Sequence, residues 1–359
     1  MGSGDEAARS TIATLIEGHW YDAVAALLDG SMSASGAPSG LVKARDLAAA
    51  ARRVLDLDAE DFASIAHGFT EPWAARLAES SFPVEPLDPE RGALGSLVPL
   101  YELMLEVLEV RAQRREPLQV VVSAHLIGEY LTQLAWESTL GHGGDPMRMA
   151  EFVGGSRWGT DDPACPHSSA LRSTAKRALH ATKGDVAGFT AYLDRFHSRL
   201  GDALGVCAMN HATIGAGERP DVGETCANPC AFVLQAPLTQ RRDLDARVRL
   251  AKTYIDSPIV NLRHHAPVGH FFGVPSVQEI SEAWLRTWER LTVPWADGAN
   301  PLLAEGLVSR PSPHEALPGM SALVSAVAGR PMGPGRLLHD IGHDVARALH
   351  GAPASEVMA

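Results

Sequence analysis

The sequence lacks the features that mark membrane-spanning and exported proteins. It has no run of about eighteen apolar residues, the length that a bilayer-spanning helix needs. Its first residues are small and acidic, without the basic start and apolar core of a secretory leader. We therefore expect a cytoplasmic protein that makes no contact with a membrane.

Cysteine is scarce, with four among 359 residues. A cytoplasm keeps thiols reduced, so we expect free thiols or metal ligands rather than disulfides. Two of the four are separated by three residues, not by the two of a zinc ribbon. This spacing favours small buried side chains over a zinc or iron–sulfur site. The four are Cys165, Cys207, Cys226 and Cys230.

Positive charge is also in short supply, because 31 lysine and arginine residues face 43 aspartate and glutamate residues, for a net charge of −12. A nucleic-acid binder needs a basic face, so the charge argues against that class. The sequence has no G-x-G-x-x-G after a strand, no phosphate-binding loop and no G-x-S-x-G. These absences disfavour nucleotide cofactors and serine hydrolysis.

No stretch of the chain alternates apolar and polar residues in the way of a half-buried strand. We therefore expect an all-α fold, with a single helical domain over residues 1–359 and an N-terminal helical subdomain over residues 1–82 before a proline-rich connector. Ser276 and Glu279 form a capping-box pattern at the start of Val277–Leu291. The predicted helices are Glu6–Leu28, Leu41–Leu57, Asp61–Glu79, Leu97–Arg111, Leu118–Trp136, Asp185–Cys207, Asp243–Tyr254, Val277–Leu291 and Arg336–His350.

Two of these helices differ in how their apolar residues are distributed. In Leu97–Arg111 the apolar residues share one face, and Glu102, Glu106 and Glu109 take the other. Leu118–Trp136 is apolar on all sides, so we expect it in the middle of the core.

His125 and Glu129 lie four residues apart on that central helix, and therefore on one face of it. Burying two ionisable groups is costly unless they are paired with each other, ligate a metal or take part in chemistry. A buried charge without a partner costs about 3–5 kcal/mol. Two interpretations stay open. The pair is either a hydrogen bond that positions the helix, or an acid–base or metal-ligating pair above a substrate pocket.

A second group of polar residues lies between Pro258 and Pro275, in a segment that we expect to be irregular. It combines Arg263, His264, His265 and His270 with two phenylalanines. Irregular chain that carries His, Arg and Phe is typical of ligand pockets. The alternative is a surface loop with scattered histidines. We expect Arg263, His265 and His270 to line one buried cavity together with His125 and Glu129.

His339 and His343 form a third group in the predicted C-terminal helix. With Asp340 between them they are similar to the H-E-x-x-H helix of metalloproteases and to the His-Asp motif of metal-dependent phosphohydrolases. Helical periodicity, however, places both histidines opposite the apolar stripe that includes Ile341 and Val345. We therefore predict that they face water and bind no catalytic metal.

The motif from His125 to Tyr130, taken with the Arg263–Gly273 segment, resembles the histidine-ligated heme-dependent aromatic oxygenases. This group includes tryptophan dioxygenase and the tyrosine hydroxylases of natural-product pathways. The resemblance implies a helical fold, a heme cofactor and a small aromatic substrate. His125 would be the distal residue that meets the substrate.

In that family another histidine ligates the heme iron, and here it would be His265, His270 or His314. Members that attach heme covalently use His-x3-Cys, whereas Pro318 stands at that distance from His314. Heme also needs an apolar slot and a cation for its propionates, a role that Arg263 would serve.

Three hypotheses follow from the sequence. The first is a heme-dependent oxidoreductase, or one that uses a non-heme iron or zinc site built from His264, His265 or His270 with Glu129. The second is a metal-dependent hydrolase or lyase centred on His339 and His343. The third is a non-catalytic helical partner protein.

Overall fold

A computed structural model of the chain describes residues 2–32, 39–81, 95–143, 237–265, 273–296, 298–304 and 315–350. In this part of the chain 75% of the residues are helical and none lies in a strand, which confirms the prediction of an all-α fold. The same residues contain no helix that is both long enough and apolar enough to cross a membrane.

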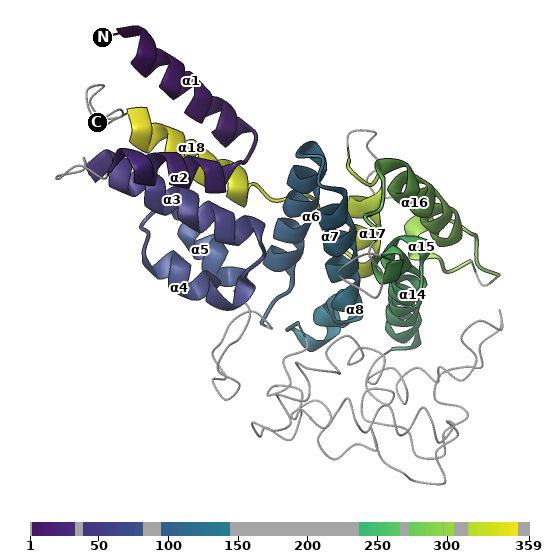
Figure 1. Cartoon of the computed structure of the whole chain (residues 1–359). Coiled ribbons are helices and arrows are strands. Elements are labelled where there is room, and N and C mark those ends of the chain that lie inside the picture. Colours follow the sequence, from purple (N-terminus) through teal and green to yellow (C-terminus); the bar gives the residue numbers. More distant parts are fainter. Residues whose placement is uncertain are drawn as a thin grey trace.

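The helices gather around two clusters of buried apolar side chains (Figure 1). The first cluster is built by the N-terminal helices together with the last helix that the structure describes. Its elements are α1 (Gly2–Glu17), α2 (Tyr21–Ser31), α3 (Ser39–Leu55), η1 (Ala59–Asp61), α4 (Phe62–His67), α5 (Pro72–Glu79) and α18 (Leu337–His350).

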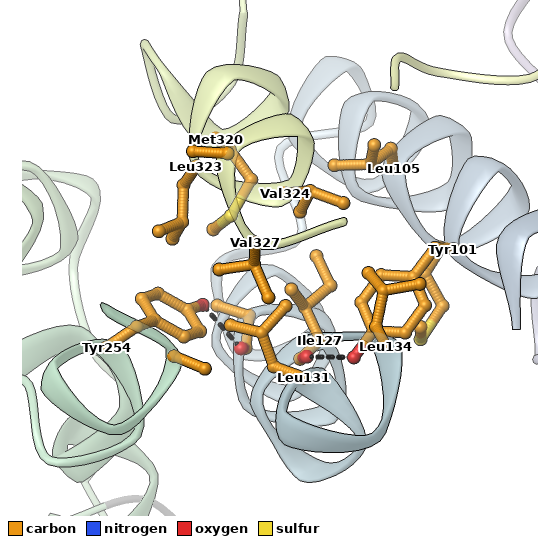
Figure 2. Close-up of a cluster of buried hydrophobic side chains, with 14 of the residues drawn as sticks. Tyr101, Leu105, Ile127, Leu131, Leu134, Tyr254, Met320, Leu323, Val324 and Val327 are labelled. Atoms are coloured by element: carbon orange, nitrogen blue, oxygen red, sulfur yellow. Dashed lines mark hydrogen bonds between the residues drawn. The ribbon is translucent and has the colours of Figure 1, made fainter. Parts of the chain in front are cut away.

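The second cluster is built by the middle of the chain and the helices that follow it. Its elements are α6 (Val98–Gln113), α7 (Pro117–Glu129), α8 (Leu131–Leu140), α14 (Leu238–Ile255), α15 (Pro258–Asn261), η6 (Leu262–His265), α16 (Val277–Leu291), η7 (Pro301–Leu303) and α17 (Met320–Ala328). Figure 2 shows side chains of α6, α7, α8, α14 and α17 meeting in this cluster.

Helix α6 belongs to both clusters and lies between them (Figure 1). Leu103 and Val107 pack on the N-terminal side, whereas Tyr101 and Met104 pack on the other. The prediction of a polar face on this helix is therefore wrong, because both of its sides are buried against other helices.

Two of the three glutamates of α6 accept hydrogen bonds from backbone N–H groups of segments packed against the helix. Glu106 is 6% exposed, and its two carboxylate oxygens accept from the N–H groups of Leu337 and His339, at 2.7 and 3.1 Å. The first N–H groups of a helix have no partner within it, so Glu106 caps the N-terminus of α18. Glu109 accepts in the same way from Ala316 N, at 2.9 and 3.0 Å.

Three predicted helices are interrupted in the structure. Leu118–Trp136 divides at Tyr130 into α7 and α8, although Val120 and Leu134 are buried as predicted. The chain also bends at His19, whose φ of 58° lies in the left-handed region and separates α1 from α2. Pro72 is the first residue of α5, where its missing N–H costs no helical hydrogen bond.

Other predicted boundaries agree more closely with the structure. The capping box of Ser276 and Glu279 is present, and α16 spans Val277–Leu291 as predicted. Helix α14 begins earlier than predicted, at Leu238, and α17 was not predicted at all. The predicted helix Asp185–Cys207 lies outside the described residues.

Replacing Glu106 with Ala removes the acceptor for two helix N–H groups in a buried place. We expect the free energy of unfolding to fall by about 1–3 kcal/mol, the cost of leaving buried donors unsatisfied. Urea unfolding followed by circular dichroism measures this change. Glu289→Ala, at an exposed position of α16, is the control and should stay within about 0.5 kcal/mol of the wild type.

Burial raises the pKa of the Glu106 carboxyl above its ordinary 4.5, although the N–H groups of His339 and Leu337 act in the opposite direction. A raised folded-state pKa means that this carboxyl contributes its full stability below the unfolded pKa and loses part of it as pH rises through the folded pKa. Gln does not titrate. We therefore expect the stability advantage of the wild type over Glu106→Gln to shrink as the pH rises above about 4.5, the ordinary pKa of the carboxyl. Urea unfolding at several pH values measures it, and an advantage that grows with pH would contradict the assignment.

Candidate functional site

His125 and Glu129 lie in the last turns of α7 and contact each other. His125 Nε2 is 2.8 Å from Glu129 Oε1, and the two side chains are 15% and 23% exposed. The other sides of the helix are held in the core by Val120, Ala124 and Ile127, which are all buried. The predicted pairing of the two ionisable groups on one face is therefore present, at a partly buried place rather than in a closed core.

The segment after α14 folds into two short helical turns, although we expected it to be irregular throughout. Pro258 opens α15 after Ser257 in extended conformation, so its fixed φ suits the first helical position. The N–H of Ile259 donates to the hydroxyl of Thr287 on α16, at 3.1 Å. The chain then tightens into η6, which carries Arg263.

The two segments meet at His125. A guanidinium nitrogen of Arg263, Nη1, is in hydrogen-bond contact with His125 Nε2, across 138 residues of sequence. The sequence predicts that these segments lie together, because each carries polar groups that its own neighbours do not satisfy. The contact gives Arg263 a partner in the protein, and the other N–H donors of its guanidinium remain for further contacts.

Arg263 and Glu129 both contact His125 Nε2, but one contact needs this nitrogen without a proton and the other needs it with one. Arginine only donates, so Nε2 must present its lone pair to Arg263. An ionised carboxylate only accepts, so Nε2 must carry a proton to donate to Glu129. The other ring nitrogen, Nδ1, is buried and has no hydrogen-bond partner among the described residues. This arrangement suits an imidazole that takes up and releases a proton at Nε2.

Tyr130 is a residue of this region to which the sequence analysis gave no role. It directly follows Glu129, at the junction of α7 and α8. Burial raises the pKa of its hydroxyl, and the negative charges of Glu129 and Glu60 raise it further. The Tyr130 hydroxyl therefore stays protonated next to Glu129. Only its position next to Glu129 signals this in the sequence, because the helix break that places it depends on tertiary packing.

The structure does not describe the remaining predicted ligands. The backbone of His265 ends η6, but its side chain lies outside the described residues, as do His270 and His314. The choice of an iron ligand among these three, and the cavity that we expect beside His125, stay predictions. The four cysteines also lie outside the described residues.

His339 and His343 lie far from this arrangement, on the exposed side of α18. His343 is 70% exposed, whereas Ile341 and Val345 are fully buried, so helical periodicity predicted the orientation of this helix correctly. Within the ranges that the structure describes, no group of three or more His, Cys, Asp or Glu side chains is arranged to hold a metal ion. The structure therefore gives no support to a metal centre on α18.

The contact between Arg263 and His125 is testable by a double-mutant cycle. We expect Arg263→Gln and His125→Ala to be non-additive in the free energy of unfolding, with a coupling of about 0.5–3 kcal/mol, as for residues in direct contact. Urea unfolding of both single variants and the double variant measures it. Arg286→Gln, at an exposed position of α16, is the matched control and should be additive with His125→Ala within about 0.5 kcal/mol.

Comparison with known proteins leaves the site to be interpreted from its own chemistry. No family model matches the chain, and no curated protein and no solved structure is significantly similar to it.

Proposed function

We propose that this protein is a heme- or metal-dependent oxidoreductase of the oxygenase or peroxygenase type, acting on a small aromatic substrate. The observation that carries the proposal is the arrangement of Arg263, His125 and Glu129, which come from two distant segments and converge on one imidazole nitrogen. A purely structural histidine needs one partner for each nitrogen. Here Nε2 contacts both a donor, Arg263, and an acceptor, Glu129, while Nδ1 has no partner among the described residues.

In this function His125 meets the polar group of the substrate and moves a proton at Nε2. Glu129 would accept the N–H of the ring, and Arg263 would donate to its lone pair. Both contacts meet at the nitrogen through which a general acid–base histidine would exchange its proton.

The described residues fit the substrate-facing side of a heme and not its iron-ligating side. Both contacts of His125 use Nε2, and Nδ1 is buried, so neither nitrogen is open to a metal. One of His265, His270 and His314 would hold the iron, and the remaining N–H donors of Arg263 would be available to a propionate. A bound heme or non-heme iron would supply the redox chemistry that amino-acid side chains do not.

Absorption spectroscopy and metal analysis of the purified protein test this proposal. We expect a Soret band, or failing that stoichiometric iron. Replacing one of His265, His270 and His314 with Ala should remove the cofactor and leave helical circular dichroism nearly unchanged. His125→Ala should keep the cofactor and slow turnover by roughly 10²–10⁴, the range for a lost general acid–base group.

His343→Ala is the control, because this histidine is exposed on α18 and should affect neither cofactor content nor turnover. A protein that contains neither heme nor a stoichiometric metal would contradict the proposal. A loss of metal in the His343→Ala variant would instead favour the hydrolase hypothesis.

A further inference from the structure

Tyr254 is a fully buried tyrosine whose hydroxyl donates to the backbone of α7 directly beside His125. Its Oη lies 2.6 Å from the carbonyl oxygen of Ala124. This carbonyl and the N–H of His125 belong to the same peptide unit, which is planar and rigid. The hydrogen bond therefore restrains the plane from which the His125 side chain leaves the helix. Figure 2 shows the ring of Tyr254 extending from α14 to this hydrogen bond.

Tyr254 is also close in sequence to Arg263. It lies one residue before the end of α14, and the chain continues through α15 into η6. The hydroxyl of Tyr254 thus joins the end of α14 to α7, a short distance in sequence before the residue that reaches back to His125. One hydrogen bond restrains both the imidazole and the backbone that carries the guanidinium.

The packing around the ring limits how far α7 can move. A Cβ placed on Gly128 would lie 3.5 Å from Tyr254 Cε1, so the surface of α7 at this glycine is in direct contact with the ring. Burial raises the pKa of the Tyr254 hydroxyl, which therefore remains a donor throughout the physiological range.

Tyr101 restrains the same turn of α7 from the opposite side. Its hydroxyl donates to the carbonyl oxygen of Ile127 at 2.7 Å, and the ring comes from α6 (Figure 2). Ile127 is in the last turn of α7, where carbonyl groups have no helical partner. Two buried tyrosines from different helices thus hold the turn that carries His125 and Glu129.

We infer that Tyr254 is a positioning residue for the contact between His125 and Arg263, with Tyr101 as its counterpart on the other side of α7. The inference rests on the proposed function, in that these tyrosines would hold the His125 imidazole in place between Glu129 and Arg263. Neither tyrosine touches the ring of His125 through a described hydrogen bond. Each acts through the backbone of α7.

The test is the ¹⁵N NMR signal of the His125 ring in the full-length protein, assigned by its loss in His125→Ala. Tyr254→Phe removes only the hydroxyl and keeps the ring in the core. We expect it to move the His125 ring signals in the direction given by Arg263→Gln, which removes the guanidinium. Amide exchange in the last turn of α7 should become about two- to tenfold faster, as for the loss of one buried hydrogen bond.

Tyr21→Phe is the matched control. Tyr21 is also buried, and its hydroxyl donates to a helix carbonyl, Leu338 O at 2.9 Å, but in the other cluster. It should leave the His125 ring signals unchanged at a similar cost in stability. Unchanged His125 signals in Tyr254→Phe would overturn the inference and make Tyr254 an ordinary core hydrogen bond.

Tyr101→Phe is the second variant to measure if Tyr254→Phe does not fold. We expect it to move the His125 ring signals as well, and unchanged signals would overturn the inference. The ring signals are measured without substrate and without any assay of turnover. A protein that lacks heme and metal but shows the shift would retain the positioning role and lose the proposed function. A protein that contains the cofactor but shows no shift would support the proposed function and overturn the positioning role.

Discussion

The architecture depends on a helix, α6, that is buried on both sides. A helix with two apolar faces has no solvent for its polar side chains, so each must find a partner in the protein or carry a desolvation cost. Glu106 and Glu109 meet this requirement by accepting from backbone N–H groups of the C-terminal part of the chain. Arg111, on the same helix, pairs with Asp56 and donates to the carbonyl of Leu55. These contacts fix the positions of segments that are distant in sequence.

The same requirement shapes the candidate site on α7. His125 and Glu129 emerge from a helix whose other side is packed into the core, and His125 contacts both Glu129 and Arg263. The difference from α6 is exposure. The pair on α7 is partly open, whereas Glu106 is closed off by α18. Glu106 is therefore assigned a structural role, whereas the chemistry that we propose belongs to the partly open pair on α7.

Features set by local sequence were predictable. The start of α16 follows from a capping box, and the exposure of His343 follows from the period of α18. The meeting of His125 with Arg263 was predictable because both segments carry polar groups with no local partner. The break at Tyr130 and the burial of Glu106 were not, since both are decided by helices that arrive from elsewhere in the chain. From sequence, a glutamate on a helix with apolar and polar residues is predicted to face solvent. Its burial becomes evident only when the segment that packs over it is known.

The place of α18 in the N-terminal cluster has a consequence for synthesis on the ribosome. Roughly 280 residues separate the end of α3 at Leu55 from the start of α18 at Leu337. At a translation rate of about 5–20 residues per second, some tens of seconds pass between the synthesis of the N-terminal helices and that of α18, which covers their apolar surface. During that interval the exposed surface is a binding target for chaperones and a risk for aggregation. The nascent chain must therefore tolerate, or be protected in, a state whose first cluster is complete only when its last helix has been made.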